Sequence, residues 1–134
     1  ITTDLIVGFP GETEELFNET IDTINKIKFS KIHVFPFSLR KGTEAENLPN
    51  HIDDVTKKNR VKVLIELSKK LEIEYFNKFI GSEVEFLPEM YKEGYIYGHT
   101  GNYLYIKKKG SIDDLNNITK SKIKKVEYPN CIGE

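Results

Sequence analysis

The sequence predicts an α/β segment with two parallel strands, followed by a small antiparallel β-barrel. Residues 5–7 form a continuous apolar run, which is typical of a parallel strand covered on both faces. A helical pattern follows, and residues 31–38 form a second apolar stretch, so this part reads as a β-α-β unit. After residue 81 the apolar period changes to two, with several short strands between turn signals, as in a small barrel. We therefore expect a domain boundary near residue 80.

The first strand is expected at residues 1–9 and ends in a sharp turn bounded by Gly8 and Gly11. Thr13 is expected to cap the following helix, and Glu14 and Glu15 complement its dipole. The apolar face of this helix recurs at steps of three and four residues, at Phe17, Ile21, Ile24 and Ile27.

A polar loop at residues 39–52 leads to a long helix, which we expect to begin at Asp53 or Asp54 and to end near Phe79. Gly81 then stands where a C′ glycine is expected. Short strands are expected around residues 83–86, 93–100, 103–108 and 123–126, which together form the barrel.

The composition limits the possible functions. The 134 residues have a formal net charge of −1, so any contact with nucleic acid must come from a local patch rather than from a global basic field. No apolar run is long enough for a membrane span. Cys131 is the only cysteine, which indicates a reducing, cytoplasmic setting and excludes a metal site built from this chain's own thiols.

Two motifs carry a resemblance to a known family. Residues 3–13 read TDLIVGFPGET, and residues 34–45 read VFPFSLRKGTEA. In this order and spacing they resemble the late part of the barrel in radical-SAM tRNA methylthiotransferases, most closely the branch that acts on threonylcarbamoyladenosine beside the anticodon. Residues 1–80 are similar to the last two strands and helices of that TIM-like barrel. Residues 81–134 resemble the OB-like TRAM barrel, which holds tRNA.

The resemblance implies that the intact enzyme uses S-adenosylmethionine and two iron–sulfur clusters to add a methylthio group to an adenosine in tRNA. The family's cluster-binding cysteines are absent from this sequence, so we expect the chain to lack activity alone and to need a preceding part of its own chain. No catalytic or metal-binding residue is therefore assigned. The resemblance places Val7, Gly8, Phe35, Phe37 and Ser38 beside the cofactor.

Candidate RNA contacts lie in two places. Arg40 and Lys41 follow the second strand, on a loop at the carboxyl end of a barrel strand, where substrate is expected to bind. The second group interleaves aromatic and basic side chains, as RNA-binding β-surfaces do, and its members are Tyr103, Tyr105, Lys107 and Lys108.

Other polar residues receive structural interpretations. His33 stands among the apolar residues of the second strand and is expected to be a core histidine with its hydrogen bonds satisfied. Asp4 and Glu12 are expected to act structurally, with Glu12 accepting hydrogen bonds from the first N–H groups of the helix. Cys131 is expected to be a small apolar filler.

Two other classes of function remain open on the sequence alone. A stand-alone RNA-binding module would bind tRNA in a salt-dependent way without residues 1–50. A structural or protein-interaction piece would form a dimer that binds no RNA at any salt, although a dimer through the open edge of the parallel sheet would be an artefact of that exposed edge.

Overall fold

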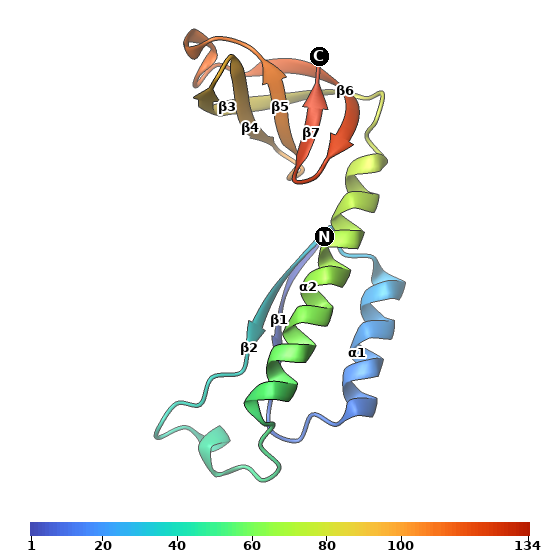
Figure 1. The fold of residues 1–134 in the computed structure, drawn as a ribbon, viewed down its shortest axis with the longest axis vertical. Coiled ribbons are helices and arrows are strands. Elements are labelled where there is room, and N and C mark those ends of the chain that lie inside the picture. Colours follow the sequence, from blue (N-terminus) through green and yellow to red (C-terminus); the bar gives the residue numbers. More distant parts are fainter. The chain divides into compact units, whose positions relative to one another are not determined.

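The computed structural model describes all of residues 1–134, which form two compact units, Ile1–Glu72 and Ile73–Glu134 (Figure 1). The division lies within helix α2 (Asp54–Asn77), whereas the sequence placed the change of pattern near residue 80. All seven tyrosines belong to the second unit. Neither α2 nor the shorter α1 (Glu14–Ile27) has the length and hydropathy of a membrane-crossing helix.

The first unit contains the predicted β-α-β arrangement. Strands β1 (Thr2–Val7) and β2 (Lys31–Pro36) pair in parallel, with Leu5 opposite Val34, and α1 connects them. Helices α1 and α2 run beside the two strands (Figure 1). The core of the unit lies between the strands and these helices, and its buried members are Val7, Phe17, Ile24, Ile32, Leu64 and Leu71.

Local hydrogen bonds fix the helix starts as predicted. The Leu16 N–H donates to Thr13 Oγ1 over 3.2 Å, which confirms Thr13 as the cap of α1. The Thr56 N–H donates to Asp53 Oδ2 over 2.9 Å, so Asp53 rather than Asp54 caps α2. Gly81 follows α2 with φ +87°, as expected of a C′ glycine. A short 3₁₀ helix, Glu44–Asn47, interrupts the polar loop that precedes α2.

The second unit is a closed barrel of five strands in the order β3-β4-β5-β7-β6. The strands are β3 (Glu83–Lys92), β4 (Tyr95–Thr100), β5 (Tyr105–Lys109), β6 (Thr119–Glu127) and β7 (Asn130–Gly133), with a 3₁₀ helix at Ile112–Asp114. The prediction of a fully antiparallel barrel was wrong, because β5 and β7 pair in parallel. An odd number of strands cannot alternate in direction around a closed ring, so one pairing must be parallel. The four strands expected from the sequence, without β7, could close into a ring with every pairing antiparallel.

The barrel has its own apolar core. Its buried members are Phe76, Phe86, Ile96, Leu104, Ile106, Ile123 and Cys131, so Cys131 fills the core as the sequence reading expected. Gly98 allows strands β3 and β4 to approach closely, because a Cβ atom there would lie 1.9 Å from the carbonyl oxygen of Leu87. The inward side chains of β4 and β5 therefore belong to the apolar core, and the polar and aromatic side chains that could bind a ligand lie on the outer face.

Candidate functional site

The carboxyl edge of the parallel pair contains the predicted cofactor residues. The Phe37 N–H donates to the Val7 carbonyl over 2.7 Å, which holds the two strand ends together. The Gly8 N–H donates to Glu12 Oε1 over 3.0 Å, so this donor is already engaged within the chain. Val7 is buried, whereas Phe35 and Ser38 are exposed and Phe37 is half-buried. What this edge offers a ligand is therefore mainly aromatic and apolar surface.

Gly8 is required by the chain itself. Its φ of +81° lies in the left-handed region, and a Cβ atom would lie 2.2 Å from Cγ of Lys57. The close neighbour of Gly8 is thus the stem of Lys57, whose Nζ lies 3.5 Å from the Phe37 carbonyl and 5.9 Å from the centre of the Phe37 ring. Phe9 meets Phe37 edge to face at 5.3 Å. An amino group and two aromatic rings therefore gather at the ends of the strands.

A buried ion pair anchors the turn that follows β1. Arg60 of α2 donates from Nη1 to both the carbonyl and the Oε1 of Glu12, each over 2.8 Å. The prediction that Glu12 accepts from the N–H groups of the helix was wrong, because its carboxylate is held by the Gly8 N–H and the Arg60 guanidinium. Arg60 also lies 5.2 Å from the Phe17 ring centre and 3.3 Å from a carboxylate oxygen of Glu14. The turn is therefore tied to α2 as well as to its own strand.

One face of the parallel pair is uncovered. Residues of β1 and β2 alternate, so Leu5, Val7, Ile32 and Val34 face the helices. The opposite face presents Ile6 beside Phe35, which are 59% and 50% exposed, and Asp4 beside His33. His33 is exposed, so the prediction of a core histidine was wrong. Arg40 and Lys41 are exposed on the loop beyond β2, as predicted.

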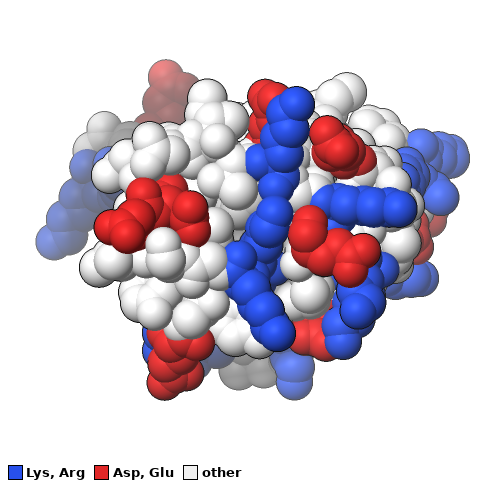
Figure 2. All heavy atoms as spheres, turned by 90° about the horizontal axis from the view of Figure 1, so that it is seen from above, with Lys and Arg blue, Asp and Glu red and all other residues white.

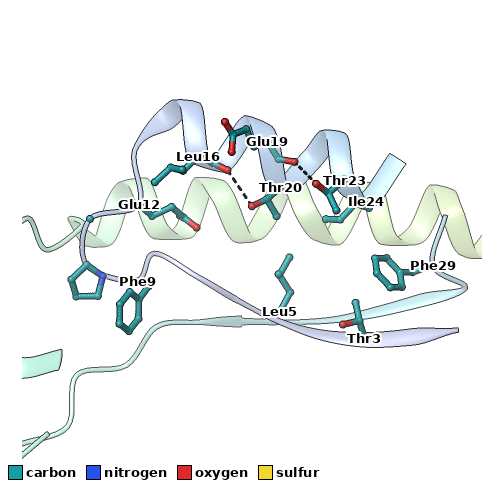
Figure 3. A pocket seen from close by; sticks show the side chains of 12 residues that line it. Thr3, Leu5, Phe9, Glu12, Leu16, Glu19, Thr20, Thr23, Ile24 and Phe29 are labelled. Atoms are coloured by element: carbon teal, nitrogen blue, oxygen red, sulfur yellow. Dashed lines mark hydrogen bonds between the residues drawn. The ribbon is translucent and has the colours of Figure 1, made fainter. Parts of the chain in front are cut away.

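A hollow of about 570 Å³ lies between β1 and α1 (Figure 3). Leu5, Phe29 and Leu16 are among the side chains that line it. The hydroxyls of Thr20 and Thr23, which also line it, donate to helix carbonyls over 3.1 Å and 2.8 Å. These two hydroxyls are therefore already used within α1, and the carboxylates in the lining are those of Glu12 and Glu19.

The outer face of β4 and β5 carries a cluster that we call the aromatic row: Tyr95, Tyr97, His99, Tyr105 and Lys107. The rings of Tyr97 and Tyr105 stack at 6.1 Å, and His99 lies 4.7 Å from Tyr105. Lys107 Nζ lies 4.6 Å from the centre of the Tyr95 ring and 5.9 Å from that of Tyr97. Burial raises the pKa of Tyr105, with a smaller contribution from the charge of Glu89, so its hydroxyl stays protonated at neutral pH. This arrangement of flat rings and one ammonium group suits the stacking of nucleobases near phosphate.

Two of the four RNA-contact residues predicted on the barrel, Tyr105 and Lys107, belong to the aromatic row. Tyr103 precedes β5 in a left-handed conformation and is highly exposed, so it does not share a strand with Tyr105. The ammonium group of Lys108 donates to the Lys120 carbonyl over 2.7 Å and is directed away from the row. The sequence reading missed Tyr95 and Tyr97, although their alternation with Ile96 was a signal for an outward pair.

The barrel unit has no net charge with which to attract RNA. It carries nine lysines and nine acidic residues. Figure 2 shows lysine and acidic side chains interspersed on one face of the molecule rather than separated into basic and acidic regions. A hollow of about 240 Å³, lined by His99, Leu87 and Ile118 among others, lies next to the aromatic row. Ring surfaces, with local lysines, are thus the main feature that this unit offers to a nucleic acid.

No group of three or more His, Cys, Asp or Glu side chains is arranged to hold a metal ion. Cys131 is fully buried in the barrel core, so its thiol does not face a ligand.

Comparison with curated proteins gives matches over the whole chain, although no protein-family model matches it. It is 42% identical to a threonylcarbamoyladenosine tRNA methylthiotransferase of Bacillus subtilis, over all of this chain and 31% of the relative. It is 41% identical to a tRNA-2-methylthio-N(6)-dimethylallyladenosine synthase of Aliarcobacter butzleri, again over all of this chain and 31% of the relative. A threonylcarbamoyladenosine tRNA methylthiotransferase of Thermotoga maritima is 41% identical over 78% of this chain and 24% of its own length. The chain thus spans about a third or less of these relatives.

Proposed function

The chain belongs to the tRNA methylthiotransferase family, and we propose that it is the C-terminal part of an enzyme that methylthiolates threonylcarbamoyladenosine next to the anticodon of tRNA. In this proposal the first unit belongs to a radical-SAM barrel and the second unit is a TRAM domain. The observation that carries the proposal is the 42% identity, over the whole chain, to a threonylcarbamoyladenosine tRNA methylthiotransferase of Bacillus subtilis. The parallel β-α-β unit and the closed five-stranded barrel agree with it.

The first unit is proposed to form one wall of the cofactor pocket. Exposed apolar side chains at the carboxyl end of the strands, Ile6 and Phe35, fit the flat adenine of S-adenosylmethionine. Val7, Gly8 and Phe37 complete this wall by holding the strand ends in place, and the exposed Ser38 is proposed to lie beside the cofactor. When bound, the cofactor supplies the radical chemistry of the reaction. The side chains of this chain contribute shape, orientation and exclusion of water.

The cluster-binding part of the enzyme is proposed to lie outside this chain. The one cysteine is buried in the barrel core, so a cluster needs ligands from another part of the protein. We expect the 134 residues to show no methylthiotransferase activity alone.

The second unit is proposed to hold tRNA through the aromatic row, with Arg40 and Lys41 of the first unit adding contacts to the same RNA. Base stacking on an aromatic side chain contributes about 1–3 kcal/mol per base. Replacing one ring of the row with leucine should therefore weaken binding roughly 5- to 150-fold.

Fluorescence anisotropy of a labelled anticodon stem-loop tests this interface with the 134-residue chain. Tyr97→Leu and Tyr105→Leu should weaken binding, whereas Tyr103→Leu, which removes a ring outside the row, should have a smaller effect. Equal losses for all three variants would contradict the assignment of the row. An unaffected Kd for the two row variants would overturn it.

The alternative of a stand-alone RNA-binding module has one observation in its favour, because the barrel is closed around its own core. Expression of the gene with its upstream reading frame distinguishes the two. The enzyme proposal requires that the longer protein bind an iron–sulfur cluster and convert threonylcarbamoyladenosine in tRNA to its methylthio derivative, detected by mass spectrometry of nucleosides. A product that binds tRNA but has no cluster and no activity would favour the binding module.

A further inference from the structure

The uncovered face of the parallel pair carries two polar groups in one row. Asp4 lies directly opposite His33 in the register of β1 and β2, and both side chains are exposed. Paired strands are about 4.8 Å apart, so a carboxylate and an imidazole stand side by side. The helices cover the other face of the pair, where all the buried core residues of these strands lie.

The next pair toward the carboxyl end is apolar. Ile6 lies opposite Phe35, about 7 Å further along the strands. The uncovered face therefore changes from apolar to polar in a single step, with the apolar pair nearer the proposed cofactor edge. With the cofactor's adenine on the apolar pair, a second ligand that reaches the polar pair needs a hydrogen-bonding extension.

The two substrates named for the relatives differ in that extension. A dimethylallyl group contains only carbon and hydrogen, whereas a threonylcarbamoyl group carries a carboxylate, a hydroxyl and N–H donors. Covering Asp4 and His33 with a hydrocarbon would leave both groups without partners, which is unfavourable. The threonylcarbamoyl group provides an acceptor for the imidazole and donors for the carboxylate.

We propose that Asp4 and His33 recognise the N6 substituent of the target adenosine and select the threonylcarbamoyl group over the dimethylallyl group. This rests on the proposed function and adds the residues that decide between its two substrate classes. His33 donates a hydrogen bond to the carboxylate of the substituent. Asp4 accepts one from its hydroxyl or N–H. Ile6 and Phe35, which are proposed to hold the cofactor's adenine, lie beside them.

Steady-state kinetics of the full-length enzyme test this proposal. The measured quantity is the ratio of kcat/KM for tRNA carrying threonylcarbamoyladenosine to that for tRNA carrying dimethylallyladenosine. His33→Phe and Asp4→Leu should each lower this ratio about 10- to 100-fold, as expected for loss of a hydrogen bond to a charged group. Their kcat/KM on the dimethylallyl tRNA should fall much less than that on the threonylcarbamoyl tRNA, or rise. His51→Phe, which alters an exposed loop histidine, is the matched control and should leave the ratio unchanged.

A loss of stability would lower both rates together, so the ratio separates recognition from folding. Asp4→Leu keeps the branched shape of the side chain and carries the test if His33→Phe melts at a lower temperature. A wild-type preference for the dimethylallyl tRNA, or variant ratios within about twofold of the wild-type value, would overturn this inference alone. A wild-type enzyme that modifies neither tRNA would overturn the proposed function and this inference with it.

Discussion

The ion pair between Arg60 and Glu12 should be the main polar contribution to the stability of the first unit. Its two side chains are 8% and 15% exposed, and they join α2 to a turn 48 residues earlier in the chain. Arg60→Met is the most informative perturbation, because methionine keeps most of the packing volume and removes the charge and the donors.

The expected loss of stability follows from what remains after the substitution. Breaking a buried ion pair by removing one partner costs about 3–5 kcal/mol, because the other charge is left uncompensated. Glu12 keeps the Gly8 N–H as a partner and has some contact with solvent, which places the expected value at about 3 kcal/mol. The Glu14 contact adds little, since that carboxylate is 75% exposed.

Urea denaturation followed by far-UV circular dichroism measures this effect, because α1 and most of α2 belong to the first unit. Lys62→Met is the matched control, since it removes a cation from an exposed position of the same helix and should change stability by less than about 0.5 kcal/mol.

The double variant Arg60→Met, Glu12→Gln should lose less than the sum of the single variants, with a coupling of at least about 1 kcal/mol. A loss below about 1 kcal/mol for Arg60→Met, or no difference from Lys62→Met, would refute the reasoning.

Three further predictions concern other parts of the chain. Gly8→Ala should destabilise the first unit by about 2 kcal/mol or more in urea denaturation, because it combines a left-handed φ with a contact to Lys57, and a Lys57→Ala background should restore only part of the loss. Hydrogen bonds from Thr56 lower the pKa of Asp53 below its ordinary value of 3.8, so the cap stabilises the fold above pH 3.8 and is lost as the pH falls through the lowered folded-state pKa. Asp53→Asn should therefore flatten the acid side of the stability–pH curve, and a curve parallel to that of the wild type would contradict this. In RNA-binding titrations, Lys107→Gln should reduce the slope of log K against log salt by about 0.7–0.9, whereas Lys108→Gln should change it less because the Lys120 carbonyl already holds that ammonium group.

Local patterns in the sequence predicted most of the secondary structure. Thr13 and Asp53 are capping residues recognisable from their neighbours, and the structure places both at helix starts. The parallel β-α-β unit followed from two apolar runs separated by a helical pattern. The parallel pairing in the barrel could not be predicted from local sequence patterns. It depended on counting β7, a strand of four residues that carries little pattern of its own.

The candidate site was predicted only in part, because only local patterns can be read from the sequence. The interleaving of rings and lysines identified Tyr105 and Lys107, which belong to the aromatic row. The contact of Arg60 with Glu12 has no signal in the sequence, because the two residues are far apart along the chain. The burial of His33 was misjudged because alternation along β2 defines two faces without indicating which one the helices cover.

The placement of all seven tyrosines in the second unit has a practical consequence for spectroscopy. The chain contains no tryptophan, so its intrinsic fluorescence comes from tyrosine and reports the second unit, which includes the end of α2 at Tyr75. Helical ellipticity reports mainly the other unit. An unlabelled sample therefore provides two independent optical signals. If their transitions separate in urea, the two units unfold as separate cooperative blocks; if they coincide, the chain unfolds as one.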